Sequence, residues 1–311
     1  MTNKVAYIFP PQNSQYVGMG KKIAQSYPEA NAVFTQANEI LGEPLSTLCW
    51  EGPEADLNDT YNTQPALFVA SYACLKALEA AGVPQQPNFV AGHSLGEFSA
   101  YAAAGIVSFE DGLKLVRERG RLMKKAGEIR PGKMAAILML PDEQVADICT
   151  QATEEAGWVQ VANYNNPGQV VISGEEEGID RAIELALAAK ARRAQKLAVS
   201  IAAHSKLMAV IQDEFKEIVE STPLTEPHTP LIANITAKPL QSVTEVRQEM
   251  VGQLTASVQW TKSIQYMVSQ GVTEFVEIGA KNALSGMIRR IDKTVTRTVI
   301  DTLSDLEKYT P

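Results

Sequence analysis

The sequence predicts an α/β protein with two lobes, in which a small βαββαβ unit is inserted into a larger domain built on a mainly parallel sheet. Short apolar runs alternate with amphipathic segments through most of the chain, which is typical of parallel strands joined by helices. Between residues 131 and 199 the order becomes strand, helix, strand, strand, helix, strand, the pattern of a ferredoxin-like unit. We therefore expect a small domain at 131–199 and a large domain at 1–130 and 200–311.

The first half of the large domain begins with the apolar run 4–9, a strand that Pro10 and Pro11 end because proline cannot donate to a ladder. Helices are expected near 18–26, at 28–41 and at 63–82, the last ending at Gly82 before Val83 and Pro84. The segment "NFVAG" at 88–92 predicts a short buried strand. It leads directly into the small-residue helix "GEFSAYAAAG".

The remaining elements follow from the same patterns. In the small domain we expect strands within 133–140, 158–165, 168–174 and 192–200, and helices within 141–154 and 175–190. The chain then returns to the large domain with a helix after His204, a strand at 229–235, a helix near 243–269, a strand at 274–279 and a last helix from about 281.

Composition excludes several classes of function. The 311 residues are 45% hydrophobic and 21% charged, which suits a globular protein with a sizeable core. A net charge of −8 argues against nucleic acid or an anionic membrane as partner, and we take the densest basic segment, 190–196, as a solvated helix end. Three scattered cysteines form neither a disulfide framework nor a zinc site. With no signal peptide or long apolar stretch, we expect a cytoplasmic protein.

The segment Gly92-His93-Ser94-Leu95-Gly96 fits the G-x-S-x-G nucleophile elbow, in which a serine occupies a tight turn between a strand and a helix. Its context favours that interpretation over an ordinary turn, because a short apolar strand precedes it and a helix follows it. We predict Ser94 as the nucleophile. A helix that begins there also directs its first N–H groups at developing negative charge, which makes the N–H of Leu95 a candidate oxyanion donor.

A serine nucleophile needs a base, and the chain has three histidines. His93 adjoins Ser94 and is given a structural role, while His228 lies between two prolines in a surface-loop context. His204 follows the small domain at a junction where clefts form, so it is the candidate base, with a buried structural histidine as the alternative. No acid is clearly placed to orient it; a backbone carbonyl that accepts from Nδ1–H could serve instead.

An arginine occupies an apolar helix face between residues 112 and 125. Positions 115, 116, 119, 122 and 123 share one face and are Leu, Val, Arg, Leu and Met. Arg117 and the other charged residues are assigned to the opposite face. A guanidinium at a core needs an anionic partner, either a structural carboxylate or the substrate. Beside a Ser/His pair, Arg119 suggests a substrate that is both an acyl donor and a carboxylic acid.

Over essentially its whole length, the sequence resembles the malonyl-CoA:acyl carrier protein transacylases of fatty-acid and polyketide synthesis. The segments that carry this resemblance are "FPPQNSQYVGMG" (9–20), "TQPALF" (63–68), "GHSLGEFSA" (92–100), "RGRLM" (119–123), "NNPGQVVISG" (165–174), "AHSKLM" (203–208), "ANITAKP" (233–239), "SVQWTKSI" (257–264) and "EIG" (277–279). The resemblance implies a hydrolase-like α/β core with a ferredoxin-like insert, in agreement with the two predicted lobes.

The resemblance also implies residue roles. Ser94 would be acylated by malonyl, His204 would take its proton, and the backbone amides of Gln12 and Leu95 would form the oxyanion hole. The implied reaction is ping-pong transfer from malonyl-CoA to the phosphopantetheine thiol of an acyl carrier protein, with no cofactor. We expect a monomer as the default.

Three further positions match the family pattern, and two of them take roles from it. Arg119 would hold the malonyl carboxylate, and Gln259 matches the position whose main-chain carbonyl orients the histidine. Gln64 matches a motif position near the site without an assigned chemical role.

The sequence departs from the family pattern at three places. Pro11 and Asn13 replace the glycines that flank Gln12, which predicts a stiffer loop with a left-handed residue at Asn13. Ala203 stands in the substrate pocket where malonyl-selective polyketide members often carry phenylalanine, so we expect better tolerance of methylmalonyl. The segment "EIGAKNAL" lacks a second glycine after 279.

Two other classes of function compete with malonyl transfer. A hydrolase of the same fold could clear acyl-carrier proteins, although a hydrolase for plain acyl chains has no use for the buried cation of Arg119. A non-catalytic module that docks carrier proteins is disfavoured by the intact pair of Ser94 and His204.

Overall fold

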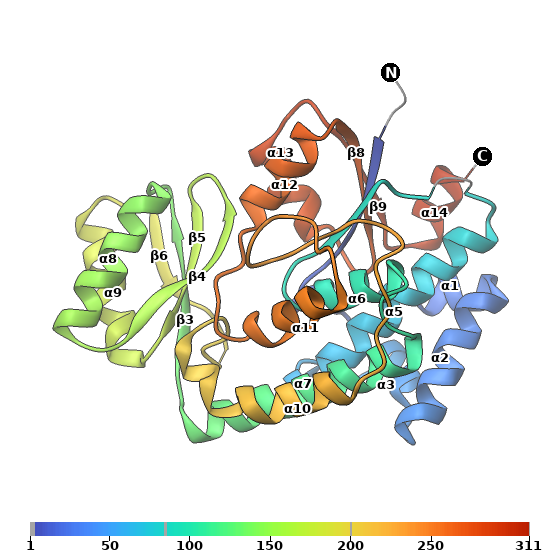
Figure 1. The fold of residues 1–311 in the computed structure, drawn as a ribbon, viewed down its shortest axis with the longest axis horizontal. Helices are drawn as coiled ribbons and strands as arrows, with labels where there is room; N and C mark the ends of the chain where they lie inside the picture. The colour runs from blue at the N-terminus through green and yellow to red at the C-terminus, as the bar shows by residue number, and fades with distance from the viewer. Residues whose placement is uncertain (1–3, 84–85, 200, 311) are drawn as a thin grey trace.

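Two sheets organise the chain (Figure 1). The structure is a computed structural model and describes residues 4–83, 86–199 and 201–310. The larger sheet has five parallel strands in the order β7-β2-β1-β8-β9. These strands are β1 (Lys4–Phe9), β2 (Phe89–Gly92), β7 (Leu231–Ile232), β8 (Val272–Ile278) and β9 (Thr296–Ile300). The predicted parallel sheet is confirmed.

Helices cover both faces of the larger sheet. They are α1 (Lys21–Ser26), α2 (Pro28–Leu41), α3 (Leu45–Glu51), α4 (Glu54–Leu57), α5 (Thr60–Ala80), α6 (Leu95–Ala103), α7 (Phe109–Ile129), the 3₁₀ helix η1 (Lys206–Ile211), α10 (Gln212–Ser221), α11 (Val243–Gly252), α12 (Trp260–Ser269), α13 (Ala283–Ile291) and α14 (Leu303–Tyr309). Along β1, Tyr7 and Phe9 belong to the core beneath α5, α6 and α7, whereas Ala6 and Ile8 belong to the core beneath α12 and α13. Successive side chains of a strand point to opposite faces, so β1 is buried on both sides.

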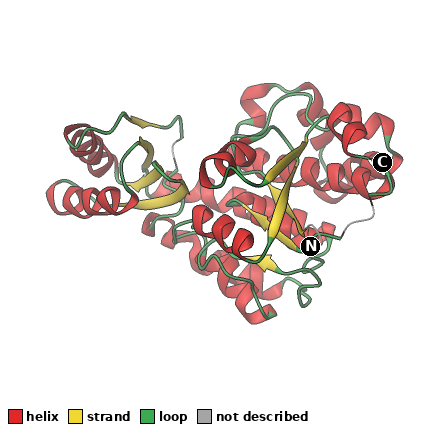
Figure 2. Ribbon diagram, turned by 90° about the horizontal axis from the view of Figure 1, so that it is seen from above, coloured by secondary structure: helices red, strands yellow, loops and turns green. Residues whose placement is uncertain are grey.

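The smaller sheet is antiparallel and lies to one side of the molecule (Figure 2). Its elements follow the predicted βαββαβ order: β3 (Lys133–Leu138), α8 (Asp142–Glu155), β4 (Val159–Asn166), β5 (Gln169–Gly174), α9 (Glu176–Ala188) and β6 (Arg193–Lys196). The strand order β4-β5-β3-β6 is that of a ferredoxin-like unit. This sheet packs against α8 and α9 around a core of its own that includes Ile137, Ile172 and Ile179.

Several element boundaries differ from the prediction. The strand expected at 192–200 ends at Lys196 (its last residue, Ser200, lies outside the described residues), and the strand expected at 229–235 is only Leu231–Ile232. After α5, Gly82 is left-handed as expected of a helix end, while Pro84 is outside the described residues. The prediction omitted α3, α4, β9 and α14.

The single helix predicted near 243–269 is wrong, because a turn at 253–255 and a short extended stretch around Val258 separate α11 from α12. Val258 in that segment pairs with the free edge of β4: its N–H donates to the carbonyl of Ala162 (2.8 Å), and its carbonyl accepts from the N–H of Tyr164 (2.9 Å). Backbone groups that bond a strand edge cannot also complete a helix. This pairing joins the two lobes beside the site described below.

Helices α5 and α7 approach closely at Gly120. A Cβ atom on Gly120 would lie 2.8 Å from the carbonyl oxygen of Thr60 and 3.2 Å from the Cα of Tyr61. The same contact corrects the prediction for Arg117, which is buried and not on a solvent face. Its guanidinium lies 4.0 Å from the centre of the Tyr61 ring, donates to the carbonyl of Tyr61 (2.9 Å) and pairs with Glu43. The start of α5 covers this part of α7, which helical periodicity alone cannot indicate.

None of the helices in the described ranges combines the length and the apolar character needed to cross a bilayer.

We predict opposite effects for two glycine-to-alanine substitutions within helices. Gly120→Ala should lower the free energy of unfolding by about 1–3 kcal/mol, because α7 must move away from the backbone of α5. Gly286→Ala is the matched control: a Cβ there meets no atom within 4 Å, so helix propensity should add up to about 1 kcal/mol. Thermal and urea unfolding measure both. Equal effects would contradict the close approach of α5 and α7.

Candidate active site

Ser94 occupies the turn between β2 and α6 with the backbone that the G-x-S-x-G motif predicts. Its φ is 53° and its ψ is −110°, a conformation that L-residues rarely adopt. The turn is also crowded: a Cβ on Gly92 would lie 1.9 Å from the carbonyl oxygen of Gly96, and one on Gly96 would lie 2.1 Å from that of Phe9. Both glycines are therefore required by the close approach of backbone segments.

The hydroxyl of Ser94 faces the imidazole of His204. Ser94 Oγ is 2.7 Å from His204 Nε2, and His204 Nδ1 is 2.8 Å from the carbonyl oxygen of Gln253. A carbonyl can only accept a hydrogen bond, so Nδ1 carries the proton and Nε2 presents its lone pair to Ser94. This is the tautomer that a general base for Ser94 requires.

The prediction that Gln259 supplies the orienting carbonyl is wrong, since Gln253 does so. Gln253 follows the last residue of α11, where carbonyl groups have no partner within the helix. Gln259 instead precedes α12, and its carbonyl accepts from the N–H of Ser263 (2.9 Å). The sequence prediction assumed one continuous helix over this segment, so the free carbonyl at the end of α11 could not be foreseen.

Burial and a neighbouring cation keep His204 neutral. Its side chain is almost fully buried, and this burial, together with the positive charge of Arg119, lowers the pKa of His204 to about 3. Arg119 is also desolvated, which lowers its pKa to about 10. At neutral pH the site therefore holds a neutral imidazole and a charged guanidinium.

Arg119 is buried as predicted, with 1% of its surface exposed. It donates to the side-chain oxygens of Gln64 (2.7 Å) and Gln253 (2.8 Å), and its Nη2 lies 3.4 Å from Ser94 Oγ. Its Nε has no hydrogen-bond partner, and within the described residues it forms no ion pair. Amide oxygens hold the guanidinium in place without neutralising it, so a charge next to the nucleophile is left for an anion.

The Gln12 loop has the backbone conformation expected from the sequence. Asn13 has a φ of 76°, and the N–H of Ser14 donates to the carbonyl of Pro11 (3.3 Å), which indicates a type II turn. The side chain of Gln12 donates to Thr60 Oγ1 (2.7 Å), and Gln15 Oε1 accepts from the N–H of Asn13 (2.8 Å). These bonds fix the loop at the start of α5.

The two predicted oxyanion donors are the backbone N–H groups of Gln12 and Leu95. Leu95 is the first residue of α6, and neither its N–H nor that of Gln12 has a hydrogen-bond partner in the described part of the chain. The first N–H groups of a helix favour negative charge.

Comparison with known proteins identifies the family. Residues 6–303 match the model of the acyl transferase domain. The malonyl CoA-acyl carrier protein transacylase of Bacillus subtilis is 38% identical over 305 residues, which cover 98% of this chain and 96% of that protein. The chain belongs to this acyl transferase family.

Solved structures of this family have the same fold. An acyl carrier protein S-malonyltransferase from Vibrio cholerae has a TM-score of 0.95 and 37% identity, covering 98% of this chain and 99% of that one. A malonyl-transacylase in complex with its type II polyketide synthase acyl-carrier protein has a TM-score of 0.95 and 36% identity, covering 99% of each chain.

Around the elbow of this acyl transferase lie residues that sequence reasoning missed. Asn234, which follows β7, accepts from the N–H of Ser94 (2.7 Å) and donates to the carbonyl of Gly92 (2.7 Å), so its amide clamps the turn. Glu97 is fully buried and accepts from the N–H of Asn234 (2.8 Å). An acidic residue within the apolar helix 95–103 was a usable signal for Glu97, and the signal for Asn234 was its place in the segment 233–239 that carries the family resemblance.

Three other residues singled out from the sequence are His93, His228 and Ala203. The buried ring of His93 packs against Trp260, and its Nε2 lies 2.8 Å from Asn165 Oδ1, in keeping with a structural role. His228 is exposed and its backbone N–H donates to Ala104 (3.1 Å). Ala203 is half-buried where the cores of the two lobes meet.

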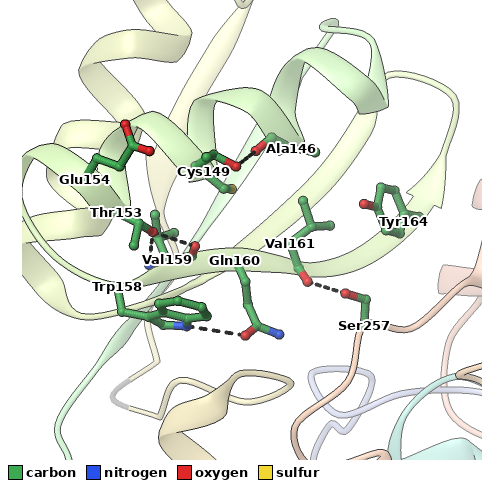
Figure 3. Close-up of a pocket in the computed structure, with 11 residues that line it drawn as sticks. Ala146, Cys149, Thr153, Glu154, Trp158, Val159, Gln160, Val161, Tyr164 and Ser257 are labelled. Carbon is green, nitrogen blue, oxygen red and sulfur yellow. Dashed lines mark hydrogen bonds between the residues drawn. The ribbon is translucent and has the colours of Figure 1, made fainter.

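A cavity of about 420 Å³ lies between α8 and β4, with Trp158 and Gln160 at its edge (Figure 3). Gln160 connects it to the base, because its Nε2 donates to the carbonyls of His204 (2.9 Å) and Thr255 (3.0 Å). Ser94 does not line this cavity. Through Gln160, the small lobe supports the loop that carries His204.

We predict that Ser94 reacts with a sulfonyl fluoride at a rate that does not change between about pH 5 and about pH 8. The reactive form needs neutral His204, and a base whose pKa is about 3 stays neutral over this range, whereas an ordinary histidine would titrate near about 6.5. Mass spectrometry of the labelled protein gives the rate, and Ser94→Ala is the control. A rate that falls tenfold per unit below about pH 6.5 would contradict the desolvated environment of His204.

Proposed function

We propose that this acyl transferase moves a malonyl group from malonyl-CoA to the phosphopantetheine thiol of an acyl carrier protein through a malonyl ester of Ser94. The observation that carries the proposal is the unpaired guanidinium of Arg119 beside a Ser94–His204 couple. A free carboxylate and a reactive acyl group must then belong to the same small substrate.

The first half-reaction forms the acyl-enzyme. Ser94 Oγ attacks the thioester carbonyl while its proton moves to His204 Nε2, and the Gln253 carbonyl stabilises the imidazolium through Nδ1–H. The N–H groups of Gln12 and Leu95 would bind the oxyanion. When the tetrahedral intermediate collapses, the C–S bond breaks and His204 returns its proton to the sulfur of CoA.

The second half-reaction reverses these roles. His204 takes the proton of the carrier thiol, the sulfur attacks the acyl-serine, and the C–O bond breaks with return of the proton to Ser94 Oγ. Both substrates supply their own thioester or thiol, so the proposed reaction needs no cofactor.

The carrier protein as partner is supported by the names of the relatives and by the solved complex of a related transacylase with its carrier. One solved relative belongs to type II polyketide synthesis and the others are named only for malonyl transfer to a carrier protein, so we propose the class of reaction and not one pathway. A cytoplasmic location and, as the default, a monomeric state remain expectations.

Hydrolysis of acyl-carrier proteins is the competing function. The buried charge of Arg119 favours malonyl transfer, because a plain acyl chain offers nothing to pair with it and its desolvation would be uncompensated. Relaxed specificity toward methylmalonyl is a refinement of the proposal that depends on the small side chain of Ala203. Direct competition between the two CoA esters measures it.

We predict that radiolabel from malonyl-CoA becomes attached to the wild-type protein and not to Ser94→Ala. Added phosphopantetheinylated carrier protein should then remove the label from the enzyme and carry it. Gel autoradiography follows both steps. Label lost to water without the carrier would identify a hydrolase, and an unlabelled wild-type protein would exclude an acyl-serine.

We predict that Arg119→Ala reverses the preference between malonyl-CoA and acetyl-CoA. Loss of a charge-assisted contact to the carboxylate should lower kcat/KM for malonyl-CoA by about 10- to 100-fold, which corresponds to about 1.5–3 kcal/mol. The kcat/KM for acetyl-CoA, which has no carboxylate, should fall little. The two rates, measured by CoA release under single-turnover conditions, give the ratio. An unchanged ratio would mean that Arg119 is structural.

A further inference from the structure

Two buried carboxyl groups lie side by side beneath the nucleophile. Glu97 of α6 is 0% exposed and Glu249 of α11 is 4% exposed. They accept from consecutive backbone groups, since the N–H of Asn234 donates to Glu97 Oε1 and that of Ile235 donates to Glu249 Oε1, both at 2.8 Å. Neighbouring amides hold the two carboxyls together, and the charge of Glu249 acts on the pKa of Glu97.

Such a pair must hold a proton. Two desolvated carboxylates in contact repel strongly, so one proton is shared between them and titration belongs to the pair. Burial raises the pKa of Glu249 to about 7 and, with the charge of Glu249, raises the pKa of Glu97. Among the described residues, the other ionisable groups that interact with the pair are Tyr101 of α6 and Arg119 of α7.

Glu97 also determines the orientation of the Gln253 side chain. Gln253 Nε2 donates to Glu97 Oε2 and to the carbonyl of Ser94 (3.0 Å), while Gln253 Oε1 accepts from Arg119 (2.8 Å). If this amide were turned over, its oxygen would face two acceptors and its NH₂ would face the guanidinium. Only one orientation satisfies all three neighbours.

We propose that Glu97 and Glu249 form a proton-sharing pair that positions Gln253, and through Gln253 both the guanidinium of Arg119 and the imidazole of His204. Gln253 can serve both groups because its side-chain oxygen meets Arg119 and its backbone carbonyl meets His204 Nδ1. The kinetic consequences of this pair rest on the proposed malonyl transfer, whereas its proton sharing does not.

Two isosteric variants distinguish this arrangement from simple packing. In Glu249→Gln, the new amide donates to Glu97 in place of the shared proton and its oxygen still accepts from Ile235. In Glu97→Gln, an oxygen still accepts from Asn234, but an NH₂ group now faces Gln253 Nε2. Gln253 must turn or lose this bond, and Arg119 then loses its acceptor.

The kinetic test compares malonyl-CoA with acetyl-CoA in both variants. For Glu97→Gln we expect kcat/KM with malonyl-CoA to fall about 10- to 100-fold, because the guanidinium that positions the substrate is displaced. The fall in kcat/KM with acetyl-CoA should be smaller. Glu249→Gln should lower kcat/KM less than Glu97→Gln does for both substrates, since it retains the donor to Glu97. A wild-type-like Glu97→Gln, equal losses in the two variants, or an unchanged malonyl-to-acetyl ratio would overturn the positioning role.

A stability test needs no activity and separates this proposal from the proposed function. A carboxyl whose folded pKa is raised binds more protons in the folded state, so its stabilising contribution is present at low pH and is lost as pH rises through the folded pKa, here about 7. As pH rises from about 5 to about 9, the melting temperature of the wild type should therefore fall relative to that of Glu249→Gln. His93 and His204 are present in both proteins, so their effect on stability cancels in the difference between the two melting temperatures. Parallel curves would overturn proton sharing, even if Glu97→Gln fails to fold.

Discussion

The site depends on one charge that forms no ion pair within the described residues, the guanidinium of Arg119 in a desolvated position next to Ser94. Removing a cation from water is costly unless it is paired, and amide dipoles offset only part of that cost. Gln64 from α5 and Gln253 after α11 supply those dipoles, so helices far apart in the sequence must meet at one residue of α7. The close approach of α5 to α7 at Gly120 and the ending of α11 at Gly252 bring these groups together.

The strained backbone of Ser94 is held by residues of the same hydrogen-bonded network. A non-glycine residue at positive φ costs about 1–3 kcal/mol and persists only where its surroundings over-determine it. At Ser94 the N–H is bound by Asn234 and the carbonyl by Gln253. Glu97 accepts from both of these residues, so the support of the elbow and the support of the cation form one hydrogen-bonded network.

The sequence predicts features that leave a local pattern and misses those that depend on contacts between distant segments. Ser94 and the burial of Arg119 were predictable because a tight turn and a helical face leave local patterns, and the fold class followed from the order of apolar runs. The identity of the orienting carbonyl was not predictable. It depends on where α11 ends, which is set by the pairing of Val258 with β4, a contact between segments 95 residues apart (258 − 163 = 95). The proximity of Glu97 and Glu249 likewise depends on how α6 and α11 pack, so no local pattern predicts it.

The same cation links substrate recognition to the basicity of His204. In the free protein the charge of Arg119 contributes to the lowered pKa of His204, second only to burial. A bound carboxylate would neutralise that charge and so raise the affinity of Nε2 for the proton of Ser94, because an opposite charge removes the repulsion felt by the imidazolium. An acyl group without a carboxylate leaves the base weak. Binding discrimination and activation of the nucleophile would then arise from one electrostatic interaction.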